Sequence, residues 1–196
     1  MPKRLTDKEK EYITRRLKEE ARKCMLTFGI KKTTVDELIK RVNIPKGTFY
    51  LFYESKELLL FDAINDMHDE VQNTLLTELT KLSDDLTVEK LTDFFVNIFE
   101  EVNDILSIMI DKDLDLLIRK LPEDKVKEHL TKDDLSIEKL FETLPLKEGK
   151  DLAAFSGAFR GIFMTLLNKR EIGEEIFENA LRLMIRGLII QILEDE

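Results

Sequence analysis

Two short apolar patterns of helical spacing, separated only by a tight turn, limit the fold of this chain more than any other feature. Both lie in the stretch TTVDELIKRVNIPKGTFYLFYESKELLL, which begins at Thr33. The first pattern puts four apolar residues on one helix face: Val35, Leu38, Ile39 and Val42. The second covers about residues 46–52 and turns Phe49 inward. Two short helices this close together predict a helix-turn-helix, whose second helix has the shape that fits the major groove of DNA.

Local signals predict where these two helices begin and end. Thr34 and Glu37 have the spacing of a capping box, and Thr33 is an alternative cap. Asn43 ends the first helix, because asparagine tolerates the left-handed conformation better than any residue except glycine. Pro45 suits the first position of the next helix, where a missing N–H costs nothing.

A longer helix is predicted on each side of this motif. The first covers about Asp7–Phe28 and ends at Gly29, and the other begins after Ser55 and continues to about Leu79. Lys56 in the first turn of the latter opposes the helix dipole by roughly 0.3–1 kcal/mol. That position is explained if Lys56 and the free N–H groups of the helix start hold a phosphate, and a solvated lysine is the alternative.

The charges are unevenly divided along the chain. Residues 1–60 carry 15 Lys and Arg against 9 Asp and Glu, whereas residues 61–196 carry 16 against 31. A basic end on a protein of net charge −9 is expected where that end binds a polyanion. A chance excess of solvated lysines is the alternative.

The second helix of the motif carries side chains that suit contacts with DNA. Lys46 can donate to a guanine or a phosphate, and Thr48 can use its hydroxyl or its methyl group. Tyr50 can donate its O–H to a phosphate and place its ring on a thymine methyl group. For Phe52 and Tyr53 we favour packing in the core.

The same residues carry a resemblance to a known family. The motifs are the leading helix that ends in Phe28-Gly29, the Thr-Thr start, the run Gly-Thr-Phe-Tyr and the Ser-Lys-Glu-Leu entry to the next helix. Together they resemble the DNA-binding segment of the tetracycline-repressor (TetR) family, over about residues 8–65. The resemblance implies an all-α fold with an N-terminal three-helix helix-turn-helix domain, residues 1–54. It also implies a C-terminal helical bundle, residues 55–196, that dimerises and usually binds a small effector.

The resemblance further implies roles for individual residues. Phosphate contacts fall on Thr33 or Thr34, Tyr50 and Lys56, and base contacts on Lys46, Gly47 and Thr48. At Gly47 the backbone would come close to a base. The sequence departs from the family pattern at Asn43, at Pro45 and in the order Phe52-Tyr53, and the last departure makes Tyr53 the alternative contact to the DNA backbone.

The acidic remainder of the chain predicts further helices. One is expected over about Val88–Ile110, a short one over residues 113–121, and two more in the stretches 151–170 and 174–196, with a loop at 145–151. The last helix has more apolar positions than one face needs, so we expect it to bury one face in its own core and the other against a second copy. The predicted dimer contacts are Phe155, Phe159, Ile162, Leu181, Ile185, Leu188 and Ile189. The alternative is that both of the last helices are internal to a monomer.

Aromatic and methionine side chains in this region indicate an apolar effector pocket between helices. The candidate pocket residues are Met67, Phe95, Phe99, Met109 and Phe163. Such side chains at helical spacing are more often plain core, which is the alternative.

Other function classes find no support in the sequence. Cys24, the only cysteine, lies on the apolar stripe of the first helix, so no internal disulfide can form and a reducing cytoplasm is expected. The two histidines, His68 and His129, lack metal-ligand spacing, and there is no Gly-rich phosphate loop, no nucleophile motif and no apolar run that could span a membrane. We therefore expect a cytoplasmic, dimeric repressor without cofactor or catalytic site, released from a palindromic operator by a small apolar or amphipathic effector. A helical protein-interaction module and an effector-independent architectural DNA binder are the alternatives.

Overall fold

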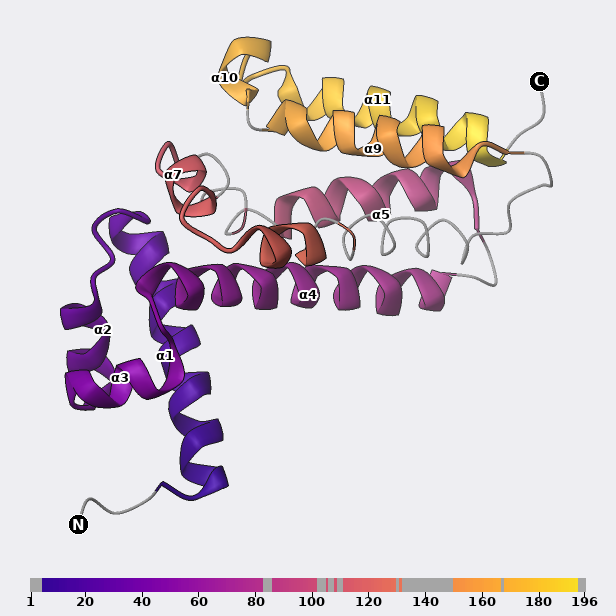
Figure 1. Ribbon diagram of the computed structural model, residues 1–196. Helices are drawn as coiled ribbons and strands as arrows, with labels where there is room; N and C mark the ends of the chain where they lie inside the picture. The colour runs from indigo at the N-terminus through magenta and orange to yellow at the C-terminus, as the bar shows by residue number, and fades with distance from the viewer. Residues whose placement is uncertain are drawn as a thin grey trace. The chain divides into compact units, whose positions relative to one another are not determined.

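A computed structural model describes residues 5–82, 86–101, 105, 108, 111–129, 131, 150–166 and 168–193. Every regular element in these residues is an α-helix, which confirms the predicted all-α fold (Figure 1). None of these helices is long and apolar enough to cross a bilayer. Contacts divide the chain into two compact units: Met1–His68 with Ser107–Val126 (unit 1), and Asp69–Leu106 with Lys127–Glu196 (unit 2). This division describes compactness, and the predicted domain boundary after residue 54 stays a prediction.

Unit 1 contains the helix-turn-helix. Its helices are α1 (Asp7–Phe28), α2 (Val35–Val42), α3 (Lys46–Phe52), the first part of α4 (Lys56–Leu82) and the short α7 (Leu114–Ile118). The bounds predicted for α1 and α3 are confirmed. Ser55 caps α4 as predicted, because its hydroxyl accepts a hydrogen bond from the N–H of Leu58 at 3.2 Å.

The core of unit 1 forms where the helices each bury one apolar face. Fully buried side chains there include Leu17, Ala21, Cys24, Leu38, Phe49, Leu59 and Leu60. Burial also raises the pKa of the Cys24 thiol, so this cysteine is a core residue and its thiolate is disfavoured. The predicted inward position of Phe49 is confirmed, and this ring fixes which face of α3 points away from the unit.

Unit 2 is a second helical assembly. It contains the second part of α4, α5 (Val88–Glu101), α9 (Leu152–Leu166), α10 (Lys169–Ile172) and α11 (Phe177–Leu193). Of the expected helix to Ile110, α5 covers the part to Glu101, and beyond it only residues 105 and 108 are described, both helical. Most of the expected loop at 145–151 lies outside the described residues. The helix predicted over 151–170 ends at Leu166, and a separate short helix, α10, follows it.

In unit 2, α11 packs along α5 and α9 (Figure 1). Phe95 of α5 meets Phe159 of α9 edge to face, with 4.8 Å between the ring centroids. At the solvent edge, Arg182 of α11 pairs with Asp93 of α5 at 2.6 Å. Aromatic contacts inside and ion pairs outside therefore hold these helices together.

The residues predicted as dimer contacts differ in how far the chain itself covers them. Ile162, Leu181, Ile185 and Ile189 are buried within the chain itself, and Phe155, Phe159 and Leu188 are half-buried. The physical reason is that α11 turns this stripe toward α5 and α9. On the opposite side of α11, Leu183 is 72% exposed in the part of the chain that the structure describes. Four of the seven predicted contacts thus pack inside unit 2, and a dimer interface on these helices stays a prediction.

Candidate nucleic-acid interface

The turn between α2 and α3 follows the local signals in the sequence. Thr34 caps α2, its hydroxyl accepting from the N–H of Glu37 at 3.2 Å. Asn43 adopts the predicted left-handed conformation, with φ 58° and ψ 52°. Pro45 lies one position earlier than predicted: it is the N-cap residue of α3, and its carbonyl accepts from the N–H of Thr48 at 2.9 Å.

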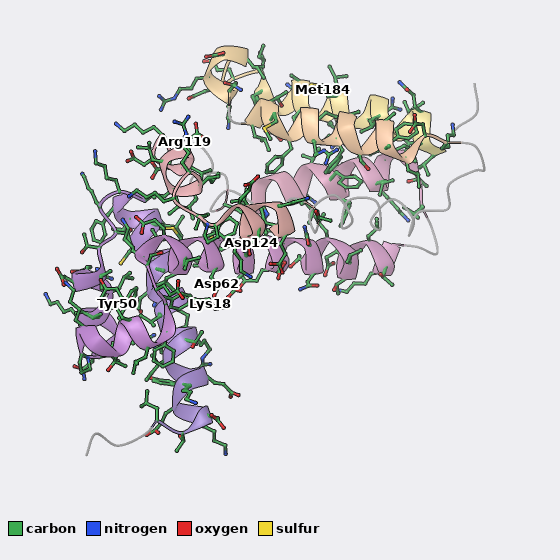
Figure 2. All side chains as sticks on the ribbon, viewed as in Figure 1. Lys18, Tyr50, Asp62, Arg119, Asp124 and Met184 are labelled. Atoms are coloured by element: carbon green, nitrogen blue, oxygen red, sulfur yellow. The ribbon has the colours of Figure 1, made fainter. Side chains whose placement is uncertain are left out.

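The helix α3 presents a mixed polar and apolar surface. Lys46 and Gly47 are exposed, and Thr48 is half-buried. Tyr50, labelled in Figure 2, is 51% exposed and packs edge to face on the buried Phe49, with 5.2 Å between centroids. Leu51, which the sequence interpretation left without a role, is 77% exposed. A leucine this exposed on a seven-residue helix makes no contribution to the core.

Lys46 is held beside the start of α2. Its Nζ lies 2.9 Å from Oδ1 of Asp36, and this hydrogen bond raises the pKa of Lys46. Both side chains are more than half exposed, so solvent screens the pair and it opens readily. Lys46 can therefore exchange Asp36 for a phosphate or a base edge at little cost.

The two threonines that precede α2 differ in accessibility. Thr33 is fully buried, and its hydroxyl donates to the carbonyl of Gly29 at 2.9 Å. Thr34 is exposed at the N-terminus of α2, where free N–H groups favour an anion. Thr33 thus closes the turn after α1, whereas the hydroxyl of Thr34 is accessible, and which of them contacts a phosphate stays a prediction.

Lys56 lies between two segments of unit 1. Its Nζ donates to the carbonyl of Ile30 at 3.3 Å, and partial burial lowers its pKa. The N–H of the same Ile30 donates to Oδ2 of Asp111 at 2.8 Å. A Cβ added at Gly29, where φ is +82°, would lie 3.0 Å from that carboxylate oxygen. The glycine therefore both ends α1 and leaves room for Asp111.

Tyr53 belongs to a polar clamp, a set of contacts within unit 1 that also includes Lys18, Asp62 and Asp66. Its hydroxyl donates to Oδ2 of Asp62 at 2.6 Å, and burial raises its pKa well above the usual range. Lys18 of α1 reaches Asp66 at 2.6 Å and Asp62 at 3.7 Å (Figure 2). The alternative that Tyr53 carries its hydroxyl to the DNA backbone is therefore not supported. The sequence signal for this clamp was the pair of aspartates four residues apart on α4, and it was missed.

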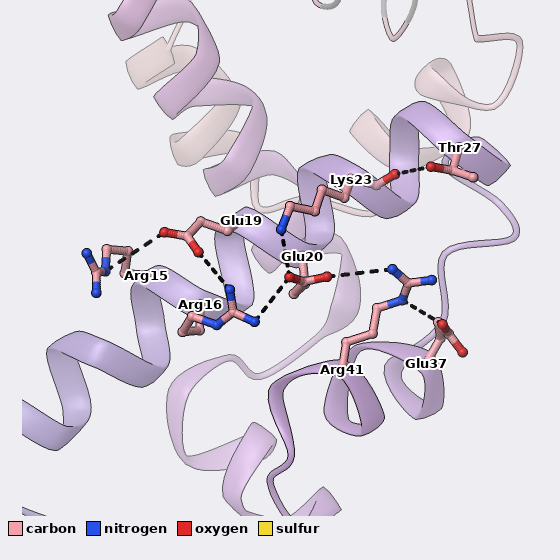
Figure 3. A network of polar contacts seen from close by, with 8 residues as sticks. All are labelled: Arg15, Arg16, Glu19, Glu20, Lys23, Thr27, Glu37 and Arg41. Atoms are coloured by element: carbon pink, nitrogen blue, oxygen red, sulfur yellow. Dashed lines mark hydrogen bonds and ion pairs between the residues drawn. The ribbon is translucent and has the colours of Figure 1, made fainter.

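A second polar network joins α1 to α2 (Figure 3). The carboxylate of Glu20 is 6% exposed and faces Lys23 at 2.9 Å, Arg16 at 3.2 Å and Arg41 of α2 at 3.6 Å. The hydrogen bond from Lys23 and the nearby guanidinium groups lower the pKa of Glu20. Arg41 in turn binds Glu37 at 2.6 Å. The network fixes α2, and through the turn α3, on α1.

The candidate effector residues are divided between the units. Met67 is buried in unit 1, Phe95 is buried in unit 2, and Phe163 is half-buried in unit 2. Met109 and the side chain of Phe99 lie outside the described residues. Within the described part of the chain, no group of three His, Cys, Asp or Glu residues is arranged to hold a metal ion.

Comparison with known proteins supports the assignment of the motif. Residues 17–63 match the family model of bacterial regulatory proteins, tetR family. The chain is 33% identical over 105 residues to the uncharacterized HTH-type transcriptional regulator YuxN of Bacillus subtilis (strain 168), a match over 53% of this chain and 35% of that protein. The matched regions span about a third of the length of the curated relatives, 35% and 31%.

Solved structures extend the likeness to most of the chain. A TetR transcriptional regulator from Rhodococcus sp. RHA1 superposes with a TM-score of 0.62 at 15% identity, covering 95% of this chain and 99% of the other. FadR of Thermus thermophilus, a TetR-family repressor in complex with lauroyl-CoA, gives 0.63 at 18% identity, with 93% and 96% covered. At these identities the likeness concerns the fold alone. The helix-turn-helix of unit 1 therefore matches the TetR family of bacterial helix-turn-helix regulators over residues 17–63, and the chain as a whole shares the all-helical fold of solved TetR-family structures.

Proposed function

We propose that the protein is a dimeric, cytoplasmic transcription regulator, acting as a repressor, in which two copies of α3 read a palindromic operator. The observation that carries this proposal is the exposed face of α3, presented by a TetR-type helix-turn-helix. Two such helices about one DNA turn apart, roughly 34 Å, would contact equivalent half-sites. Non-enzymatic action agrees with the family, whose members are regulators.

Charge supports contact with a polyanion. The first 60 residues have six more basic than acidic residues, 15 against 9, although the whole protein is acidic. Thr34, Tyr50 and Lys56 lie on or beside the helix-turn-helix as candidate phosphate contacts. For Lys56, binding a phosphate means giving up a 3.3 Å hydrogen bond to the Ile30 carbonyl, and this long bond costs little to exchange.

Support for a dimer comes from the uncovered face of α9 and α11. Gly157 and Gly161 lie one turn apart on the exposed side of α9, and a Cβ at either would meet nothing within 4 Å. Each glycine in a helix interior costs about 1 kcal/mol relative to alanine, and packing among the residues that the structure describes gives no reason for either. Close approach by a second helix would explain both. Leu183 and Gly187 are exposed one turn apart on α11 and would complete this face.

Support for an effector comes from the aromatic interior of unit 2. Phe94, Phe95 and Phe159 form a chain of edge-to-face contacts, with centroids 5.1 and 4.8 Å apart. On the same side of α9 as Phe159, Ser156 is buried, and its hydroxyl has no hydrogen-bond partner among the described residues. An apolar surface with one unused polar group suits a small apolar or amphipathic ligand. The lauroyl-CoA complex of the Thermus thermophilus FadR is an example within this fold.

The DNA-binding part of the proposal is tested by selection of bound duplexes from a random pool, followed by titration at several salt concentrations. We expect a palindromic site and a steep loss of affinity with salt. Lys56→Ala should lower the slope of log K against log salt by about one unit per half-site. A wild-type protein that binds no duplex in a salt-dependent way would overturn the proposal.

The dimer is tested with a matched pair of exposed leucines. Leu183→Glu on α11 should give monomers in light scattering, because it buries a charge at the proposed seam. Leu116→Glu on α7, where the leucine is also exposed, should leave the mass unchanged. If both variants stay dimeric, the interface lies elsewhere.

A further inference from the structure

We propose that Leu51 is the specificity-determining side chain of α3 and that it reads the methyl group of a thymine in the major groove. This inference rests on the proposed DNA-binding function and names the base contact that the function requires. The sequence interpretation gave base contacts to Lys46, Gly47 and Thr48 and none to Leu51. The geometry of α3 changes that assignment.

The position of Leu51 follows from the anchor on the other side of the helix. Phe49 is completely buried, so its direction defines the back of α3. In an α-helix, successive residues are about 100° apart, which puts Gly47 and Leu51 each about 160° from Phe49. These two residues therefore lie at the centre of the face that points away from unit 1. The exposure of Leu51, 77%, agrees with this position.

The polar side chains of α3 lie on the flanks of that face. Lys46 and Tyr50 are displaced toward one side, and Thr48 toward the other, where it is half-buried. Lys46 is moreover turned toward Asp36, 2.9 Å away. A helix seated in a groove directs its flanks to the two phosphate strands and its centre to the base edges. Lys46, Tyr50 and Thr48 thus suit backbone contacts, and Leu51 with Gly47 meets the bases.

The chemistry of leucine selects the base. In the major groove only thymine offers an apolar group, its C5 methyl, beside the polar atoms that every base pair presents. Leu51 forms no hydrogen bond, so placing it on a guanine, adenine or cytosine edge would remove water from polar atoms without replacing its hydrogen bonds. Gly47, where a Cβ would meet nothing within 4 Å of the chain, leaves space for the base to approach. A thymine opposite Leu51 is therefore the favoured pairing.

The test exchanges thymine for uracil, which lacks only this methyl group. In the selected operator, each thymine is replaced singly by deoxyuridine, in both half-sites together, and the affinity of the full chain is measured by fluorescence anisotropy. We expect one position at which uracil weakens wild-type binding about four-fold per half-site, the factor that corresponds to roughly 0.8 kcal/mol for a buried methyl group. Leu51→Ala should bind the thymine and uracil duplexes equally well.

Tyr50→Phe is the matched control on the same helix. It should weaken binding to both duplexes by the same factor and keep the preference for thymine, because its lost hydroxyl is a backbone contact. Circular dichroism should show native helix content for both variants, since neither side chain is buried.

The outcomes separate this inference from the function on which it rests. If wild type binds no duplex, the proposed function fails and the inference with it. If wild type binds an operator but tolerates uracil everywhere, or if Leu51→Ala keeps the preference for thymine, the inference fails and the proposed function stands.

Discussion

Glu20→Gln tests the network that fixes the helix-turn-helix on α1 (Figure 3). The change keeps the volume of the side chain and removes its charge. Glu20 has three cationic partners; Lys23 makes the shortest contact, a hydrogen bond of 2.9 Å, but at 59% exposure it is the partner most screened by solvent. The other two, Arg16 and Arg41, are about one-third exposed, at 30% and 34%. A hydrogen bond to a charged group contributes about 1.5–3 kcal/mol and a neutral one about 1 kcal/mol, so for the screened bond from Lys23 together with the two ion pairs we expect a loss of about 1–2 kcal/mol.

The matched control is the neighbouring carboxylate. Glu19 pairs with Arg16 at 3.1 Å and Arg15 at 3.9 Å, but its side chain is 42% exposed. Glu19→Gln should therefore change stability by less than about 0.5 kcal/mol. Thermal unfolding followed by circular dichroism should lower the midpoint of Glu20→Gln by roughly 2–8 °C and leave that of Glu19→Gln nearly unchanged. Equal midpoints for the two variants would refute the argument from burial.

The same network predicts a pH dependence. The hydrogen bond from Lys23 lowers the pKa of Glu20 in the folded state, whereas the unfolded side chain titrates near 4.3. The stabilisation is therefore fully present above about pH 4.3 and is lost as the pH falls through the lower folded value. Wild type and Glu20→Gln should differ at pH 7 and approach equal stability in acid. A difference that persists at pH 2 would mean that the charge of Glu20 is not its source.

Three further variants probe single contacts. Gly47→Ala should raise the free energy of unfolding by about 0.5–1 kcal/mol, because the added Cβ meets nothing within 4 Å and alanine favours the helix. The same variant should bind duplex DNA more weakly. If it gains stability and still binds normally, the DNA does not approach α3 at Gly47. Ser156→Ala should raise the free energy of unfolding by about 1 kcal/mol, measured as a higher melting temperature, because it removes a buried hydroxyl that has no hydrogen-bond partner among the described residues. A lower melting temperature would show that the hydroxyl has an acceptor. Tyr53→Phe should lower the free energy of unfolding by about 1 kcal/mol, because the hydrogen bond to Asp62 is lost. The salt dependence of DNA binding should stay unchanged. A changed salt dependence would indicate that Tyr53 contacts a DNA phosphate.

The sequence was a good guide wherever a feature depends on residues a few positions apart. The cap at Thr34 uses an N–H three residues away, and the left-handed Asn43 responds to its own side chain and the helix before it. The inward ring of Phe49 follows from helical spacing within α3. Both partners of each interaction lie within about one helical turn of each other, so a short stretch of sequence contains all the residues needed to predict it.

Polar contacts between residues far apart in the sequence could not be predicted in this way. Asp111 accepts from the N–H of Ile30, a residue 81 positions earlier, and nothing in either local pattern indicates the other. Tyr53 shows the consequence. Its hydroxyl was free to be assigned to DNA until the fold placed Asp62 at 2.6 Å. A polar side chain next to a recognition helix therefore gets its role from which partner the tertiary structure brings closest.

The faces of α11 illustrate a different limit. Apolar residues surround much of this helix, so their spacing predicts two buried faces. The same spacing fits both faces, so it does not say which of them packs inside the chain. Leu181 and Ile185 lie on the stripe that packs on α5 and α9, whereas Leu183, two residues from each, lies on the opposite side. The rotation of α11 about its own axis decides between them, and that rotation is set by packing against side chains of other helices. Gly187 weakens α11, and a Cβ there would meet nothing within 4 Å among the described residues, so the structure gives this glycine an exposed position on the side of Leu183.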